Sequence, residues 1–369
     1  MLAKPGIQSI SAYQGGRPVE EVQRELGLTD VIKMASNENP LGPSKRAVDA
    51  MAEAVASVHF YPDGNAYYLK NAVAEFHDVA PEQLLFGNGS SDVLQILGET
   101  YIAAGDHIVF PGQSFVVYSL ISAIFDARTT TPPLTNDGYD LATLAAAVTD
   151  RTAAIIAEPI LGEGGIRPLS PQFAAAINDA CARTGALYIA DEVQTGLGRT
   201  GHPFYAQVLG LRPDLMSIGK SLGGGVPIGA ALVSERVAQA VSPGDHGSTY
   251  GGNLLGTRAA VFVLDQLIGG LIDHVKTVGV HFEQQLDALA LRHPSIVEAR
   301  GVGVMRAIQL NMDAARIIDA ARDRGLLVNR TDERVIRLLP ALNVEAADID
   351  RAVEVLDGVF TAIETEAPA

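Results

Sequence analysis

The chain has 369 residues, a net charge of −16 and 47% hydrophobic residues, which is ordinary composition for a globular protein. The acidic excess argues against nucleic-acid binding, which needs clustered Lys and Arg. No uninterrupted apolar run reaches the roughly 20 residues that a membrane helix requires. A single cysteine excludes an intramolecular disulfide and fits a reducing compartment. We therefore expect a cytoplasmic protein that binds neither nucleic acid nor membrane.

The elements in chain order predict a large α/β domain over residues 41–255. Residues 1–40 are rich in turn formers, and a helix is expected from 44 to 57. Short β-branched runs then alternate with amphipathic helices, which predicts a sheet with helices on both faces. The strands are expected near 85 and at 107–110, 153–157, 186–190, 215–218 and 229–233, and the helices near 90–103, 115–125, 140–148 and 171–184.

The pattern changes after about residue 255. Two long helices, roughly 253–269 and 271–292, precede short strands around EARGVGVM, GLLVN and VIRLLP. A last helix is expected from about 346 to 364. This order predicts a smaller α+β domain over 256–369, completed by the N-terminal segment.

Two polar residues follow neighbouring predicted strands of the large domain. Asp191 comes directly after ALYIA, and Lys220 follows LMSI and precedes three glycines. Ligands of open α/β sheets collect at the carboxyl ends of strands. A carboxylate and an amine at one such edge suit a pyridine aldehyde, which needs imine formation at one end and a partner for its ring nitrogen at the other. Taken singly, an aspartate in the position of Asp191 is more often a helix or turn cap. A lysine in the position of Lys220 is more often a surface residue in a flexible loop.

A glycine-rich turn supplies a possible anion site. In GNGSSDVLQIL the turn opens a helix, whose first N–H groups and positive dipole end favour a phosphate. Gly89, Ser90 and Ser91 are the candidates, although Ser-Ser-Asp is also an ordinary N-cap. Phe115, in PGQSFVVY, could stack on a flat ring or belong to the core.

From about residue 153 onward the chain resembles the class III aminotransferases, above all those that act on acetylornithine and ornithine. The matching motifs are EPILGEGG, DEVQTGLGRTG, PDLMSIGKSLGGGVPIGA, PGDHGSTYGGN and VIRLLP. The resemblance implies pyridoxal phosphate (PLP) as cofactor and the PLP fold type I, with a mainly parallel seven-stranded sheet and a smaller α+β C-terminal domain.

The same resemblance implies roles for individual residues. Lys220 would carry the cofactor as a Schiff base and move the proton, Asp191 would pair with the pyridine nitrogen, and Gln194 would contact the ring hydroxyl. Thr249 would reach the phosphate bound by the neighbouring subunit.

The resemblance also implies substrate-binding residues. Arg337 would clamp a substrate carboxylate, and Glu163 would pair with that arginine when the carboxylate is absent. Glu158, in the same EPILGEGG motif, is a further substrate-binding candidate. In the alternative without a functional role, Arg337 forms a salt bridge on an edge strand and Glu163 is a solvated charge in a loop.

Residues 1 to about 150 look instead like histidinol-phosphate aminotransferase, so the chain resembles a chimera joined near residue 152. The motifs are AYQGGRPVEEV, ASNENPLGPS, YPDGN, FGNGSSDVL and PGQSFVVY. This resemblance implies phosphate binding by Ser90 and Ser91, ring stacking by Phe115, and contact with the partner subunit's phosphate by Tyr61. It places Tyr13 and Asn37 at the substrate entrance.

The class III resemblance, which covers the catalytic residues and Arg337, predicts an aminotransferase that moves an amino group from an ω-amino donor, such as acetylornithine or ornithine, to 2-oxoglutarate. Histidinol-phosphate aminotransferase activity is the alternative. A PLP-dependent racemase or lyase, or a PLP-binding protein without turnover, also fits the Lys220 and Asp191 pair. The cross-subunit residues predict a homodimer with shared active sites, and no metal is expected.

Overall fold

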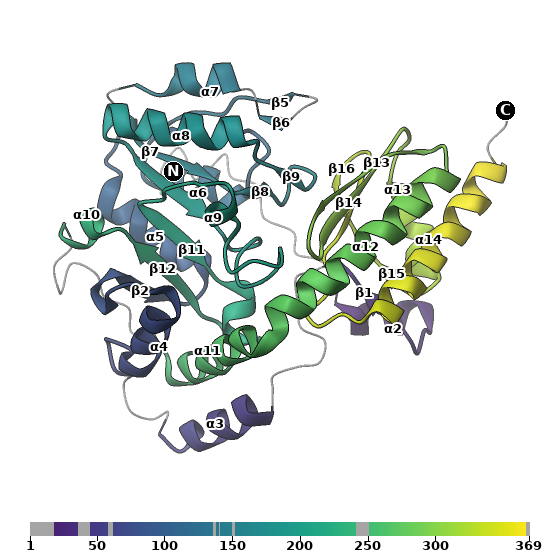
Figure 1. The fold of residues 1–369 in the computed structure, drawn as a ribbon, viewed down its shortest axis with the longest axis horizontal. Helices are drawn as coiled ribbons and strands as arrows, with labels where there is room; N and C mark the ends of the chain where they lie inside the picture. The colour runs from purple at the N-terminus through teal and green to yellow at the C-terminus, as the bar shows by residue number, and fades with distance from the viewer. Residues whose placement is uncertain are drawn as a thin grey trace, which may run out of the picture.

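The structure is a computed structural model that describes residues 18–35, 45–57, 62–135, 138–139, 141–149, 152–240 and 251–366. It comprises a large unit built on a seven-stranded sheet and a smaller unit built on a four-stranded sheet. Figure 1 shows the two units side by side, with the long helix α12 (Ile272–Arg292) leading from one to the other. Two short hairpins, β5 (Leu134–Thr135) with β6 (Gly138–Tyr139) and β8 (Ile160–Leu161) with β9 (Arg167–Pro168), extend the large unit.

The sheet of the large unit is mainly parallel, which confirms the predicted fold class. Its strand order is β2-β12-β11-β10-β7-β3-β4, and only β12 runs antiparallel to its neighbours. The strands are β2 (Leu84–Gly87), β3 (His107–Val109), β4 (Arg128–Thr130), β7 (Thr152–Ala157), β10 (Leu187–Asp191), β11 (Leu215–Ile218) and β12 (Gly229–Val233).

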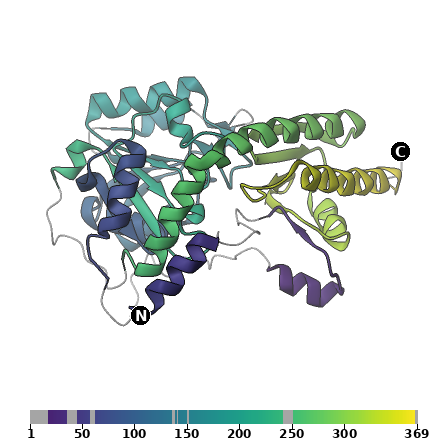
Figure 2. The ribbon, with the colours of Figure 1, turned by 60° about the horizontal axis from the view of Figure 1, so that its bottom comes forward.

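Helices cover both faces of this sheet (Figure 1, Figure 2), because strands that are apolar on both sides must be shielded from water. In α8, Ser170 caps the start by accepting a bond from the Phe173 N–H at 3.1 Å, and Gly185 ends the helix at φ 77°. The helical elements of this unit are α3 (Lys45–Val55), α4 (Tyr67–His77), η1 (Pro81–Gln83), α5 (Ser90–Tyr101), α6 (Val116–Ile124), α7 (Leu141–Ala147), α8 (Pro171–Thr184), α9 (Tyr205–Val208), η2 (Lys220–Gly223), α10 (Glu235–Ala238) and α11 (Leu254–Gln266).

The smaller unit is an antiparallel sheet with helices packed on one face. Its strands lie in the order β13-β14-β17-β16. A parallel pair of β1 with β15 attaches the segment around α2 to this unit, and Val22, Ala35 and Leu327 form its buried cluster. The elements are α2 (Val19–Leu26), β1 (Ile32–Lys33), β13 (Ile296–Val302), β14 (Met305–Leu310), α13 (Ala315–Asp323), β15 (Leu326–Leu327), β16 (Asn329–Asp332), β17 (Val335–Leu338) and α14 (Ala346–Glu366).

The two faces of β17 have different partners, because successive side chains of a strand point to opposite sides. Ile336 and Leu338 belong to the main core, together with residues of α12 and α14. Val335 and Leu339 instead join a cluster with Ile160 of β8 in the large unit. Arg337 lies two residues from both Val335 and Leu339 and therefore shares their face of the strand. The alternation thus directs the Arg337 side chain toward the large unit.

Helix α11, the π-helical turn η3 (Leu267–Leu271) and α12 run consecutively from Leu254 to Arg292. This run is long and apolar enough to cross a membrane by length and composition, although Arg258 and Asp265 interrupt its apolar residues and the chain kinks at Gly270, where φ is 121°. Core helices of soluble proteins pass the same test. Ala260 and Leu264 of α11 and Phe282 of α12 are buried in the main core, so the run packs as part of the folded chain.

Several elements were not predicted. The helices α2, α4 and α13 and the edge strand β4 are among them, although α2 and α13 are clearly amphipathic. β4 has the sequence RTT, and two of its three residues are exposed, so it lacks the alternation that marks a half-buried strand.

Candidate active site

Asp191 is the last residue of β10 and is only 3% exposed. Its Oδ1 accepts bonds from the Val193 N–H and the Ser217 hydroxyl, both at 3.1 Å. Its Oδ2 accepts a bond from the Tyr118 hydroxyl of α6. A buried carboxylate is costly unless its oxygens are satisfied, and these three neutral donors meet most of that need.

Lys220 follows the neighbouring strand, two residues beyond β11. Asp191 pairs in register with Ser217 of β11, so the structure brings the ends of the two strands together as expected. The Lys220 amine lies 5.9 Å from the centre of the Phe115 ring. Lys220 adopts φ 46°, a left-handed conformation that is unusual for a residue with a side chain.

The protein around the Lys220 amine makes it easier to deprotonate. Burial lowers the pKa of Lys220, and the nearby negative charge of Asp191 opposes that shift. The residue as a whole remains exposed, so the amine is both accessible and partly desolvated. These are the conditions in which a lysine acts as a nucleophile.

The start of α5 packs closely against two glycines. A side chain at Gly229 would place its Cβ 2.4 Å from the Gly89 carbonyl carbon, and one at Gly219 would lie 3.4 Å from the Ser90 Cβ. Gly89 itself has φ 101°. The first turn of α5, including Ser91, is therefore next to the residue that precedes Lys220, and helix starts of this kind bind anions.

Arg337 reaches from the smaller unit to the large one, as the alternation along β17 requires. Its Nη1 donates to Glu163 Oε1 at 2.6 Å and to the Gly162 carbonyl oxygen at 3.0 Å. Its Nε is buried without a hydrogen-bond partner among the described residues. Gln194 Nε2 lies 3.5 Å from the same Glu163 oxygen. The structure thus brings Arg337, Glu163 and Gln194 together.

Glu158 is a buried carboxyl beside this group, 3% exposed. Its Oε2 accepts a bond from the Gly162 N–H at 2.9 Å, whereas its Oε1 has no partner within the part of the chain that the structure describes. Burial, and then the negative charge of Asp191, raise its pKa to about 8. Glu158 therefore carries a proton at neutral pH and is a potential hydrogen-bond donor.

Four candidates lie outside the described residues: Tyr13, Asn37, Tyr61 and Thr249. The structure places none of them. The predictions for the substrate entrance and for the cross-subunit phosphate contacts concern these four.

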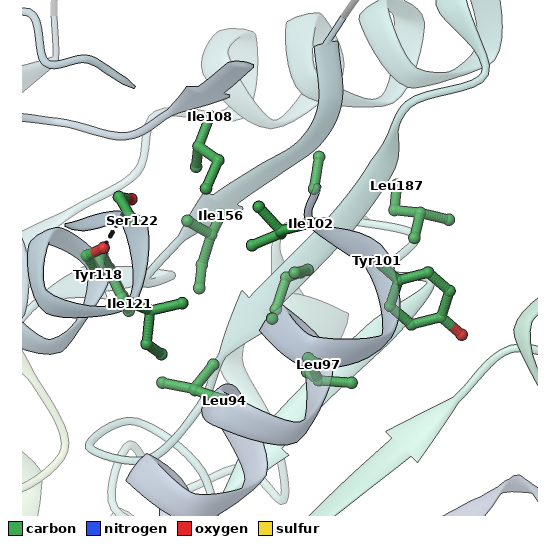
Figure 3. Close-up of a pocket in the computed structure, with 13 residues that line it drawn as sticks. Leu94, Leu97, Tyr101, Ile102, Ile108, Tyr118, Ile121, Ser122, Ile156 and Leu187 are labelled. Atoms are coloured by element: carbon green, nitrogen blue, oxygen red, sulfur yellow. Dashed lines mark hydrogen bonds between the residues drawn. The ribbon is translucent and has the colours of Figure 1, made fainter. Parts of the chain in front are cut away.

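Two residues that contact Asp191 were missed by sequence reasoning. Tyr118 is three residues beyond Phe115, which on a helix means the same face, and Ser217 is the one polar residue of the strand LMSI. Tyr118 also lines an apolar cavity between α5, α6 and the sheet (Figure 3), with a volume of about 50 Å³. The spacing of Tyr118 and the polarity of Ser217 were the available signals, but neither shows that the hydroxyls reach Asp191.

A model of the family "Aminotransferase class-III" matches residues 117–360, which is more than half of the chain. The chain belongs to the class-III aminotransferases. This confirms the resemblance of the C-terminal part, and the match extends upstream of residue 153 into α6. Members of this family use PLP.

Individual relatives agree with this assignment. The chain is 42% identical over 228 residues to the acetylornithine aminotransferase of Methanocaldococcus jannaschii. The aligned residues cover 61% of this chain and 57% of that protein. It thus matches little more than half the length of this curated class-III relative.

Solved structures are similar over more of the chain. The ornithine aminotransferase of Toxoplasma gondii ME49 superposes with a TM-score of 0.75 and 26% identity, covering 87% of this chain and 83% of that one. The ornithine delta-aminotransferase of Plasmodium falciparum gives a TM-score of 0.73 and 26% identity, covering 88% and 85%.

Proposed function

We propose that this chain is a PLP-dependent aminotransferase that moves an amino group from an ω-amino donor of the acetylornithine or ornithine type to 2-oxoglutarate. The observation that carries the proposal is the meeting of Lys220 and Asp191 at the ends of adjacent strands, with Phe115 beside the amine. Family membership and the names of the relatives support the choice of donor.

The residues present fit PLP. The buried carboxylate of Asp191 suits a protonated pyridine nitrogen, and the Phe115 ring suits stacking on a flat heterocycle. The glycine-packed start of α5, with Ser90 and Ser91, suits the phosphate. When bound, PLP supplies an aldehyde that condenses with amines and a ring that withdraws electrons from the adjacent carbon.

Lys220 has two tasks in this proposal. Its partly desolvated amine would hold the cofactor covalently when PLP is bound. Once free, the same amine would be placed to accept a proton from the substrate carbon and to donate it again. Asp191 would accept a hydrogen bond from the protonated ring nitrogen, and Gln194 is proposed to contact the ring hydroxyl.

Arg337 and Glu163 are proposed to accommodate the two substrates in turn. The ion pair at 2.6 Å satisfies the guanidinium when no carboxylate is bound. A 2-oxo acid would replace Glu163 on Arg337, whose fork geometry suits a carboxylate. Glu158, protonated and with one oxygen unpartnered, is proposed as a donor to the substrate from the same side.

The resemblance of residues 1 to about 150 to histidinol-phosphate aminotransferase stays part of the proposal. Its support is that two of its motifs supply the start of α5 and Phe115. No arginines for a substrate phosphate were identified, so histidinol phosphate remains the alternative donor. We also retain the predictions of a homodimer that shares its active sites through Tyr61 and Thr249, and of a cytoplasmic location.

A donor screen read from the cofactor spectrum tests the proposal. The purified chain with PLP is mixed with single amino donors and no acceptor. An aminotransferase should convert the bound cofactor to its amine form and release an oxo product, and 2-oxoglutarate should reverse the change. A racemase or lyase should turn over without accumulating the amine form. Binding of PLP without turnover of any donor would support a non-catalytic protein, and failure to bind PLP would refute the proposal.

A further inference from the structure

The carboxylate of Asp191 has one acceptor position left. An ionised carboxylate has about four lone-pair sites. Val193 and Ser217 occupy two on Oδ1, and Tyr118 occupies one on Oδ2. All three donors are neutral, and no cationic side chain of the described residues forms an ion pair with Asp191. The remaining site lies on Oδ2, the oxygen that Tyr118 also contacts.

The ring of Tyr118 is held by its packing. The residue is 3% exposed, and its ring meets those of Phe110 and Phe115 edge to face, at centroid distances of 5.9 and 6.1 Å. The Ser122 hydroxyl donates to the backbone carbonyl oxygen of Tyr118 at 2.8 Å, a contact within α6 (Figure 3). The burial and the two ring contacts keep the Tyr118 hydroxyl in one place.

One helix end therefore carries two contacts to the same site. Phe115 directly precedes α6 and lies beside the Lys220 amine, and Tyr118, one turn later, donates to Asp191. The position of α6 sets both the aromatic ring near the amine and the orientation of the carboxylate.

We propose that Tyr118, assisted by Ser217, is a positioning residue that fixes the orientation of the Asp191 carboxylate and leaves a single Oδ2 site for the ring nitrogen of PLP. This inference rests on the proposed function. Hydrogen bonds to the charged form of a buried acid stabilise that form, and a fixed orientation reduces the cost of binding. The titratable groups that interact with Asp191 through space must be kept constant in any test: Glu158, Tyr188, Glu192 and Lys220.

The structure offers a matched control. Tyr101 lines the same cavity as Tyr118, but its buried hydroxyl has no hydrogen-bond partner among the described residues. Tyr118→Phe and Tyr101→Phe remove the same atom from two tyrosines of one cavity, and only the first removes a bond to Asp191. Ser217→Ala removes the second hydroxyl.

The experiment measures PLP affinity of the apoprotein by titration, together with the absorbance maximum of the bound cofactor. We expect Tyr118→Phe to raise the Kd for PLP about tenfold or more, because a hydrogen bond to a charged group is lost. A carboxylate that is no longer held in one orientation contacts the ring nitrogen less well, so the absorbance maximum of the bound cofactor should shift as well. Ser217→Ala should shift both properties in the same direction, and Tyr101→Phe should match the wild type.

The outcomes separate this inference from the proposed function. If the wild type fails to bind PLP, both are wrong. If the wild type binds PLP and a folded Tyr118→Phe protein has the same affinity and cofactor spectrum, only the inference is wrong. An equal change in Tyr101→Phe would assign the effect to cavity packing and would also overturn it. Should Tyr118→Phe not fold, Ser217→Ala decides in the same assay.

Discussion

Filling the apolar cavity under Tyr118 should stabilise the chain. The cavity, about 50 Å³, is lined by Ala154 of β7 and by apolar side chains of α5 and α6. Its lining comes from both sides of residue 152, where the two sequence resemblances meet. Ala154→Val adds two carbons that the cavity can accept. At about 0.8 kcal/mol per buried CH₂, the free energy of unfolding should rise by about 1.6 kcal/mol. The entropy lost in ordering the valine side chain reduces this net gain to about 1 kcal/mol.

Urea denaturation measures this gain as a shift in midpoint at constant slope. The matched control is Ala157→Val on the same strand. Ala157 is 2% exposed and faces the main core on the other side of the sheet, where added volume should destabilise by about 1–3 kcal/mol. Valine suits a strand at both positions, so backbone preference does not separate them.

The opposite signs of the two variants are the test. A destabilised Ala154→Val protein would mean that side chains already fill this space. A stabilised Ala157→Val protein would show that β-propensity rather than cavity volume decides, and would refute the packing argument.

Lys220→Ala should reduce turnover by at least about 10⁴-fold because nucleophile and base are lost together, whereas turnover of the exposed control Lys276→Ala should equal that of the wild type. Arg337→Lys should raise the KM for the 2-oxo acid at least about tenfold, since one amine cannot replace a bidentate fork, and an unchanged KM would remove Arg337 from acceptor binding. Burial and the charge of Asp191 raise the pKa of Glu158 to about 8, so the folded chain holds a proton that the unfolded chain loses near pH 4.5, and the contribution of Glu158 to the free energy of unfolding should fall as pH rises between these values. Denaturation at a series of pH values should show this contribution as the difference between the wild type and Glu158→Gln. Burial lowers the pKa of His77 to about 4, so the contribution of His77 has the opposite sign and rises from about pH 4 to 6.5, and the difference between the wild type and His77→Leu should show it.

Much of the large unit followed from local pattern. The strands 215–218 and 229–233 and the helix 171–184 were predicted with the bounds that the structure shows, because buried strands are short apolar runs and α8 carries its own cap, proline and glycine. The edge strand β4 and helix α4 were missed. Their residues are partly exposed or polar, so pairing and packing, rather than local preference, make them regular.

The candidate site divides in the same way. Lys220, Asp191 and the glycine-rich start of α5 are marked in the sequence, because strand ends and glycine turns have local signatures. The bond from Tyr118 to Asp191, the packing of Gly219 and Gly229 against α5, and the unpartnered oxygen of Glu158 have no such signature.

The sequence by itself determined the fold class, the family and the residues at two strand ends, since these depend on periodicity and on contiguous motifs. Only the tertiary structure decided which hydroxyls orient Asp191 and that Arg337 reaches Glu163 from the other unit. The reason is physical: such contacts join residues far apart in the chain, and side-chain packing, which no local pattern encodes, sets their distances.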